Sequence, residues 1–464
     1  MTSIANNSFS SGIFPKSLKT ACVTPILKKG DKKIVSNYRP ISVVHYASKI
    51  LEKLIQNRLH SFLHRFNIIS ENQFGFRRGK STQDALIKLV DYFYDSLESK
   101  EFSAAIFVDY QKAFDTVNHH ILLQKLEAYG IRGMALKLFE SYLTDRRQFV
   151  RIGESCSEES PCNIGVPQGT ILAPLLFTLY INDLNNISNE MSLILFADDT
   201  TLLFRNHSYD QLLETCNSEL VKFRKWTICN RLSLNIDKTH VFIVSNRKIQ
   251  YQPELYYGDM LLSVKRECLF LGVLIDDSLK FGNHIKNLSS KISKSAGILF
   301  KLNQFTPPKV MRGLYFSLVY PYLTYCNTVW GTTFNTHLQP LIRAQKRIIR
   351  IINKEPFLAH TSPLFRKLSI LKFEDINYYF VSVYMYKNSN SFETTSSHGY
   401  STRQSVDLRT SLRRTALTQH SIFYVGPKIW NTLPLVIRNL ENLNSFKRNL
   451  KLYLLSKYVD LLET

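Results

Sequence analysis

The stretch LILFADDTTLLF, residues 193–204, places two adjacent aspartates between two apolar runs. Apolar arms around a short polar centre predict a β-hairpin with a tight turn. A carboxylate in apolar surroundings is unfavourable unless it is paired, hydrogen-bonded or bound to a cation. Asp198 and Asp199 are therefore either turn residues, which aspartate often is, or ligands of a positive group.

A third acid stands at the end of another apolar run. Residues 104–108 predict a buried strand that leads directly into Asp109. Carboxylates on adjacent strands are ligands that Mg²⁺ takes, and two such ions about 3.5–4 Å apart can hold both oxygens of an in-line phosphoryl displacement. Asp109 alone could also cap the following helix. Taken together, Asp109, Asp198 and Asp199 favour a metal site, as in polymerases and nucleases.

The charge of the chain indicates a polyanionic partner. Its 464 residues include 59 Lys and Arg against 37 Asp and Glu, a net charge of +22 with 44% hydrophobic residues. At roughly 100–200 residues per domain, we expect a globular protein of two to four units. Between Lys16 and Lys80 there are 14 basic residues and three acidic ones. Between Phe281 and Arg350 there are ten basic residues and no acidic one. Each segment could be a solvated face, but together they predict two walls of a nucleic-acid groove.

Several other classes are disfavoured. The apolar run Ile171–Ile181 contains Pro174 and is shorter than the about 20 residues that a bilayer requires, so no membrane partner is expected. Residues 1–20 lack a secretory signal pattern, which favours the nucleus or cytoplasm over secretion. The seven cysteines are scattered without a C-x-x-C pair, so we expect core packing rather than disulfides or a zinc knuckle.

Hydrophobic periodicity predicts the elements around these acids. Helices are predicted over 50–66, 85–97, 121–129 and 209–226, and a capping box at Ser81 and Asp84 opens the second of them. A hairpin with a basic tip is predicted over 21–44, and short strands near 232–245 and 268–275. A turn at 165–169 is followed by an apolar segment over 171–184. Beyond about residue 280 the pattern is mostly helical. Residues 388–402 predict a loop, and Trp430 with Phe423 and Tyr424 predicts a hydrophobic anchor rather than a stacking platform for RNA.

A series of short motifs follows in one order along residues 15–275. They are KK (28–29), NYRPIS (37–42), QFGFR (73–77), FVD (107–109), KAFDTV (112–117), GVPQGTILAPL (165–175), FADDT (196–200), LN (234–235), KT (238–239) and FLGV (270–273). This order resembles the reverse transcriptase of non-LTR (LINE-type) retrotransposons, jockey-like or chicken-repeat-like.

The resemblance implies an α+β right-hand polymerase. After an N-terminal segment over 1–20, it implies fingers over about 21–100 and a ferredoxin-like palm with an antiparallel sheet over about 101–265. A helical basic thumb would occupy 276–354. A basic, mostly helical region of unknown role over 355–464 would complete the chain.

The resemblance also implies roles for individual residues. Asp109, Asp198 and Asp199 would bind two Mg²⁺ ions, with Mn²⁺ as an alternative, Asp198 more directly than Asp199, and with the Tyr110 carbonyl near the metal. The other expected roles are Lys28 and Arg39 on the triphosphate, Phe114 as the steric gate against a 2′-hydroxyl, Gln168 and Gly169 at the nucleotide, Lys238 as general acid, and Arg77, Arg343, Lys346 and Arg347 on template and primer. Without the resemblance, Phe114 equally fits a core position and Lys238 a loop charge.

These residues favour an RNA-directed DNA polymerase acting on an RNA template, a DNA primer, their hybrid and deoxynucleoside triphosphates. An inactive relic that binds nucleic acid without polymerising is the alternative. Phe114 argues against a third function, RNA-dependent RNA synthesis. Such elements usually place an endonuclease before the polymerase, and we expect none in the short segment before the fingers.

Overall fold

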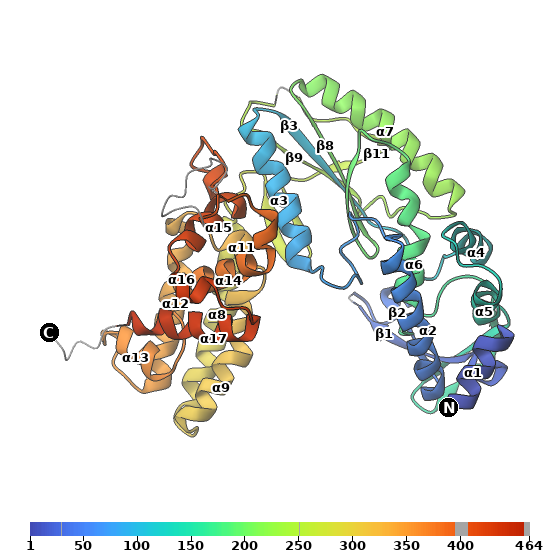
Figure 1. The fold of residues 1–464 in the computed structure, drawn as a ribbon, viewed down its shortest axis with the longest axis horizontal. Helices are drawn as coiled ribbons and strands as arrows, with labels where there is room; N and C mark the ends of the chain where they lie inside the picture. Colours follow the sequence, from blue (N-terminus) through green and yellow to red (C-terminus); the bar gives the residue numbers. More distant parts are fainter. Residues whose placement is uncertain (29, 250, 395–406, 459–464) are drawn as a thin grey trace. The chain divides into compact units, whose positions relative to one another are not determined.

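The computed structural model describes residues 1–464 except 29, 250, 395–406 and 459–464 (Figure 1). The chain divides into two compact units. Unit 1 consists of Met1–Ser81, Ser103–Phe242 and Ile249–Val264, and unit 2 of Thr82–Phe102, Ile243–Lys248 and Lys265–Thr464. The expected loop over 388–402 lies outside the described residues from residue 395 onward. The bounds of fingers, palm and thumb stay predictions.

Unit 1 contains both larger sheets of the described chain. Its helices are α1 (Thr2–Ser11), α2 (Tyr46–Arg65), α4 (His119–Ala128), α5 (Met134–Leu143), α6 (Ala173–Tyr180) and α7 (Tyr209–Cys229), with 3₁₀ turns η1 (Lys16–Leu18), η2 (Val35–Asn37) and η3 (Asn182–Asn186). Its strands are β1 (Thr20–Leu27), β2 (Tyr38–Val44), β3 (Phe102–Val108), β4 (Arg146–Ile152), β5 (Ser155–Cys156), β6 (Ser160–Cys162), β7 (Ser192–Phe196), β8 (Asp199–Asn206), β9 (His240–Val244), β10 (Tyr256–Tyr257), β11 (Met260–Leu261) and β12 (Ser263–Val264), of which β3 and β9 each extend into the segments of unit 2.

The first sheet confirms the predicted basic hairpin. Its order is β2-β1-β4-β5, with β6 also on β4. Strands β1 and β2 are antiparallel, with Leu27 opposite Tyr38. The Lys28 amide donates to the Asn37 carbonyl at 2.9 Å and closes the base of the tip. The hairpin therefore projects Lys28 and Arg39 from the end of a paired ladder.

The second sheet carries the acids. Its order is β12-β9-β3-β8-β7, and α7 runs along β3, β8 and β9 (Figure 1). Every residue of β3 is buried, as its apolar run predicts for a central strand. Strands β7 and β8 form the predicted antiparallel hairpin. Both acid-bearing strand ends therefore belong to neighbouring strands.

Two details of this sheet differ from expectation. Phe196 pairs with Asp199, so the turn consists of Ala197 and Asp198 alone, and Asp199 begins β8. Ala197 adopts a φ of 57°, the left-handed conformation that short hairpin turns require. The expected sheet was antiparallel, but β12 joins β9 in parallel. The connection over residues 245–262 is long enough for the crossover that parallel strands need.

The predicted helices of unit 1 are confirmed within a few residues. Helices α2, α4 and α7 cover the expected segments, and α6 with η3 accounts for the apolar run after the turn at 165–169. In unit 2, helix α3 begins at Thr82, directly after Ser81 and three residues before the expected start. Together with the two sheets, these elements confirm the α+β class.

Unit 2 is helical, as the sequence predicts beyond residue 280. Its elements are α3 (Thr82–Glu98), β13 (Glu267–Phe270), β14 (Val273–Asp276), α8 (Gly282–Leu302), α9 (Pro308–Leu318), α10 (Tyr320–Thr324), α11 (Asn327–Trp330), α12 (Asn335–Asn353), α13 (Ser362–Lys367), α14 (Phe373–Asn388), η4 (Ser389–Ser391), η6 (Thr418–His420), α15 (Ile422–Asn431), α16 (Leu435–Arg438) and α17 (Leu443–Ser456). Helices α8 and α12 pack side by side (Figure 1). Trp430 is 7% exposed and packs with Tyr386 and Phe446, so its predicted role as an anchor is confirmed.

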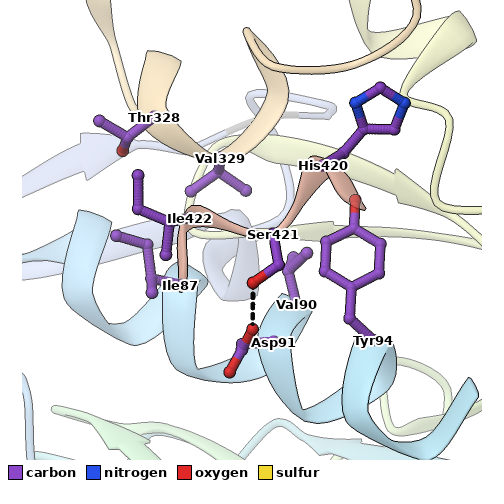
Figure 2. Close-up of a pocket in the computed structure, with 9 residues that line it drawn as sticks. All are labelled: Ile87, Val90, Asp91, Tyr94, Thr328, Val329, His420, Ser421 and Ile422. Carbon is purple, nitrogen blue, oxygen red and sulfur yellow. Dashed lines mark hydrogen bonds between the residues drawn. The ribbon is translucent and has the colours of Figure 1, made fainter. Parts of the chain in front are cut away.

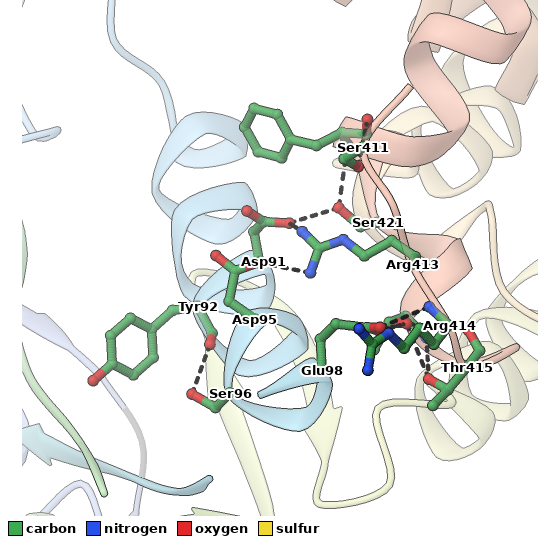
Figure 3. A network of polar contacts seen from close by, with 12 residues as sticks. Asp91, Tyr92, Asp95, Ser96, Glu98, Ser411, Arg413, Arg414, Thr415 and Ser421 are labelled. Atoms are coloured by element: carbon green, nitrogen blue, oxygen red, sulfur yellow. Dashed lines mark hydrogen bonds and ion pairs between the residues drawn. The ribbon is translucent and has the colours of Figure 1, made fainter. Parts of the chain in front are cut away.

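A polar network fastens the segment before α15 to α3 (Figure 3). The Arg413 side chain is 7% exposed and reaches Asp91 Oδ1 at 3.2 Å and Asp95 Oδ1 at 2.6 Å. The Ser421 hydroxyl donates to Asp91 at 2.6 Å. Glu98 accepts hydrogen bonds from the Arg414 amide at 2.7 Å and the Thr418 hydroxyl at 2.6 Å. Acids spread over two turns of α3 thus bind one C-terminal segment of the same unit.

A small cavity that shares Asp91 and Ser421 with this network is lined by α3, α11 and residues 420–422 (Figure 2). Its volume of about 10 Å³ is that of a single water molecule. Its polar groups come from Asp91, Tyr94, Thr328, His420 and Ser421. The cavity is therefore a packing gap within unit 2 rather than a substrate site.

The remaining sequence expectations have mixed outcomes. Cys216, Cys268 and Cys326 are buried as expected, but Cys156 and Cys229 are exposed, so the expected core role is wrong for those two. Both exposed cysteines lie at element ends, where the chain meets solvent. Within the described ranges, no helix is long and apolar enough to cross a membrane.

Candidate active site

Asp109 leaves the buried strand β3 and is held by the loop that precedes β9. The Asn235 amide donates to the Asp109 carbonyl at 2.7 Å, and the Asp109 amide donates to the Thr239 hydroxyl at 3.3 Å. Lys238 Nζ lies 3.0 Å from Asp109 Oδ2. Both side chains of this ion pair are more than a third exposed, so it contributes at most about 1 kcal/mol. Lys238 can therefore leave Asp109 at little free-energy cost.

Asp198 and Asp199 lie near enough to Asp109 for their charges to interact with it. Although both side chains reach solvent, desolvation of the carboxylates by the surrounding protein is the largest cause raising their pKa values. Repulsion from Asp198 and then Asp109 adds to the shift for Asp199 and brings its pKa to about 6. The three carboxylates are thus close enough to repel one another, and a positive charge placed among them would be stabilised.

Cations of the hairpin β1–β2 also act on this cluster. Arg39 and Lys28 both lower the pKa of Asp198, and Lys28 lowers that of Asp199. The structure therefore brings together five of the residues that the sequence singles out, namely Lys28, Arg39, Asp109, Asp198 and Asp199. An anionic ligand bound near Lys28 and Arg39 would lie next to the carboxylates.

The turn at 167–170 packs against β2. The Ser42 amide donates to the Gln168 carbonyl at 2.7 Å. Gly169 has a φ of 104°, and a Cβ there would lie 3.0 Å from the Ser42 carbonyl oxygen. Both the conformation and the close approach therefore require glycine at this position.

Asp115 holds the side chain of Gln168 and was not singled out by the sequence reasoning. Gln168 Nε2 donates to Asp115 Oδ1 at 2.9 Å. Burial raises the pKa of Asp115, and the Gln168 hydrogen bond opposes that shift. The sequence signal that could have identified Asp115 is its place directly after Phe114 in the KAFDTV motif. Asp115 fixes the orientation of the Gln168 amide.

Phe114 and Tyr110 lie near the acids in sequence and are packed differently. Phe114 is half-buried, with its ring 4.9 Å from that of Phe177 on α6. Tyr110 is buried, and its backbone forms an antiparallel bridge with Leu234. The gate role of Phe114 and the metal contact of the Tyr110 carbonyl stay predictions.

The cations expected on template and primer belong to different units, with Arg77 in unit 1 and the other three on α12 of unit 2. Arg77 forms an ion pair with Glu71 and donates to the Ser70 carbonyl at 2.8 Å. Arg343, Lys346 and Arg347 share one face of α12 in unit 2, where Arg343 and Arg347 are exposed. Residues three and four apart on a helix lie side by side. These three residues therefore form a basic stripe on their own unit.

The carboxylates fit a cation that arrives with its own ligands. In the part of the chain that the structure describes, no three His, Cys, Asp or Glu side chains are gathered tightly enough to enclose a metal ion. Mg²⁺ keeps several waters and usually binds one or two carboxylates together with substrate phosphates. Three mutually repelling aspartates beside Lys28 and Arg39 suit such shared coordination.

Comparison with known families identifies the class of protein. The family model described as "Reverse transcriptase (RNA-dependent DNA polymerase)" matches residues 26–275, more than half of the chain. The chain therefore belongs to the reverse transcriptase family. Reverse transcriptases generally use divalent metal ions.

Curated relatives come from mobile elements. The chain is 29% identical over 384 residues to the RNA-directed DNA polymerase from mobile element jockey of Drosophila funebris, covering 80% of this chain and 42% of the relative. It is 28% identical over 374 residues to the probable RNA-directed DNA polymerase from transposon X-element of Drosophila melanogaster, covering 78% and 41%. The predicted resemblance to non-LTR retrotransposons is confirmed. The chain spans about two fifths of the length of these relatives.

Solved structures with a detectable likeness include telomerases. Apo telomerase from Candida tropicalis aligns with a TM-score of 0.45 at 11% identity, covering 85% of this chain and 72% of that one. Telomerase from Candida albicans in complex with a fragment of telomeric RNA aligns with a TM-score of 0.41 at 12% identity, covering 79% and 65%.

Proposed function

We propose that this protein is an RNA-directed DNA polymerase that adds deoxynucleotides to a primer 3′-hydroxyl on an RNA template. The observation that carries the proposal is the convergence of Asp109, Asp198 and Asp199 with the cations Lys28 and Arg39 in one unit. Its partners are an RNA template, a DNA primer, their hybrid and deoxynucleoside triphosphates.

Asp109, Asp198 and Asp199 would hold two Mg²⁺ ions, or Mn²⁺ in their place. When bound, such ions acidify the attacking hydroxyl and neutralise charge on the phosphates. The carboxylates contribute negative charge on neighbouring strand ends, fixed by the backbone of β3 and β8. Lys28 and Arg39 bind the triphosphate and stabilise charge that moves onto the leaving pyrophosphate.

Lys238 is the proposed general acid. In the structure its ammonium pairs with Asp109 at 3.0 Å, and both groups remain exposed. A triphosphate near Asp109 competes for this ammonium, because phosphate oxygens offer a denser negative charge. Lys238 would then donate a proton to the leaving pyrophosphate as the bond between the α-phosphorus and the bridging oxygen breaks.

Gln168, Gly169 and Phe114 form the proposed nucleotide pocket. Gly169 would let the backbone approach the nucleotide, and Asp115 keeps the Gln168 amide in one orientation. Phe114, supported by Phe177, would lie against the sugar and exclude a 2′-hydroxyl.

The basic surfaces would bind the hybrid through its backbone. Arg343, Lys346 and Arg347 offer neighbouring cations on α12, and an A-form-like duplex is recognised mainly through phosphates and 2′-hydroxyls. For Arg77 we propose a template contact made while its guanidinium keeps its bond to Ser70. We also propose a nuclear or cytoplasmic location, in keeping with the free cysteines.

The test is primer extension on an RNA template with Mg²⁺ and deoxynucleotides. Native protein should extend the primer, and Phe114→Ala should raise ribonucleotide incorporation. Tight binding of the hybrid without any extension would overturn the proposal in favour of a non-catalytic, nucleic-acid-binding protein. Unchanged sugar discrimination in Phe114→Ala would remove only the gate role.

A further inference from the structure

Glu52 is a fully buried carboxylate that the proposed chemistry does not use. It lies on α2 with 0% exposure. Its Oε2 accepts a hydrogen bond from the Ile171 amide at 2.7 Å, and its Oε1 accepts one from the Ser48 hydroxyl at 3.1 Å. Burial raises the pKa of Glu52, and these hydrogen bonds oppose that shift. A buried carboxylate with both oxygens engaged is a built contact rather than a chance one.

The Ile171 amide needs such an acceptor because of where it lies. Helix α6 begins at Ala173 with Leu172 at the N-cap, so Ile171 lies just before the helix and its amide makes no hydrogen bond within it. A carboxylate near a helix start is also favoured by the helix dipole. Glu52, which comes from another helix, therefore supplies the acceptor for an amide directly ahead of α6.

Glu52 acts together with its neighbours on α2 and β4. Gln56, one turn later, donates to the Ile171 carbonyl at 3.2 Å, so α2 holds both sides of this residue. Arg146, 2% exposed, lies near enough to lower the pKa of Glu52. The backbone of Ile171 is thus fixed to α2 within a buried, charge-balanced environment.

Ile171 directly follows the turn that carries Gln168 and Gly169. Within the turn, the Thr170 hydroxyl donates to the Pro167 carbonyl at 2.9 Å. The turn is tied to β2 through Ser42 at one end and to α2 through Glu52 at the other. Its position therefore depends on both ties.

We propose that Glu52 is a positioning residue that sets the Gln168–Gly169 turn for the incoming deoxynucleoside triphosphate and thereby determines nucleotide affinity. This inference rests on the proposed function of the turn. Without Glu52, the half-buried Ile171 amide lacks its acceptor, which is unfavourable for a backbone donor. A shift of the turn relieves that cost and moves Gln168 and Gly169 away from the nucleotide.

Two substitutions separate the hydrogen bond from the charge. Glu52→Met and Glu52→Gln both remove the negative charge beside Arg146, but only glutamine keeps an oxygen for the Ile171 amide and can donate to Ser48 in return. Leu59→Ala is the matched control, because Leu59 is buried on the same helix and distant from Glu52 by about two turns. The measurement is single-nucleotide addition over a range of deoxynucleotide concentrations, alongside hybrid affinity and hydrogen exchange of residues 165–175.

For Glu52→Met we expect a KM for the nucleotide raised on the order of 10-fold, a smaller change in kcat, an unchanged hybrid Kd and faster exchange at Ile171. Glu52→Gln should restore most of the affinity, and Leu59→Ala should lower stability without raising KM. A native KM in a folded Glu52→Met variant, or an equal rise in all three variants, would overturn the inference. Absence of nucleotide addition by native protein would instead overturn the proposed function, while hydrogen exchange would still report whether Glu52 fixes the turn.

Discussion

Two groups of aspartates in this protein have similar acidity and different neighbours. Asp199 in unit 1 and Asp91 in unit 2 each have a pKa raised to about 6, in both cases mainly by desolvation of the carboxylate and then by a neighbouring aspartate. Asp91 contacts the buried guanidinium of Arg413 and the hydroxyl of Ser421. Asp198 and Asp109 raise the pKa of Asp199, and Lys28 is the cation that lowers it.

The difference indicates which group serves stability and which serves chemistry. In unit 2 the positive charge is built into the protein, so the acids hold a C-terminal segment on α3 (Figure 3). In the described part of unit 1, Asp109 pairs with Lys238, and both side chains of this ion pair are partly exposed to solvent. Acids that repel one another without a built-in partner are typical of sites that bind a cation or substrate.

Removing an acid of unit 1 should give the largest effect. We expect Asp198→Asn to lower the rate of single-nucleotide addition by at least about 10³-fold, because a metal ligand supplies several kcal/mol of transition-state stabilisation. Stability should be unchanged or higher, since the substitution removes repulsion with Asp109. The control is Asp237→Asn, an exposed aspartate of the same unit. Activity within a few-fold of native would contradict this role.

Removing the cation of unit 2 should act on stability. We expect Arg413→Met to lower the free energy of unfolding by about 3 kcal/mol, because Asp91 is left buried without its counter-charge. Denaturant unfolding measures the change, and the exposed neighbour in Arg414→Met is the control. Equal stability of the two variants would show that the network does not hold the segment.

The pH dependence of stability should distinguish native protein from Asp91→Asn. The folded pKa of about 6 lies above the unfolded value of about 3.9, so the folded state binds more protons between these values. Native stability relative to the variant should therefore rise by roughly 2 kcal/mol as the pH falls from 7 to 4. Thermal unfolding of both proteins across this range measures the difference. A difference that shrinks on acidification would contradict the raised pKa.

The smallest effect is expected on the basic stripe of α12. Arg347→Gln should weaken hybrid binding by roughly 1 kcal/mol and reduce the salt slope of log K by about 1, while nucleotide addition at saturating hybrid stays native. Lys225→Gln, an exposed cation of α7, is the control. An unchanged salt slope for Arg347→Gln would remove α12 from the proposed hybrid surface.

Local patterns predicted much of this structure, and long-range contacts account for most of what they missed. The buried strand before Asp109 and the hairpin around Asp198 follow from apolar runs and turn residues. The role of Glu52 did not follow from any local pattern, because its partner Ile171 lies 119 residues away. Arg413 meets Asp91 across 322 residues for the same reason. The sequence did not predict that β8 begins at Asp199. That start follows from the left-handed backbone conformation of Ala197, a conformation that alanine rarely adopts.

The most direct test of a cation site at Asp109, Asp198 and Asp199 is to locate the cation chemically. Fe²⁺ replaces Mg²⁺ in protein bound to a primer–template hybrid and a non-reactive triphosphate, and peroxide with ascorbate then cleaves the chain next to the metal. We expect cleavage near residue 109 and near residues 198–199, suppressed by excess Mg²⁺ and lost in Asp198→Asn. Cleavage confined to other segments, or unaffected by Mg²⁺ and by the substitution, would contradict the metal site.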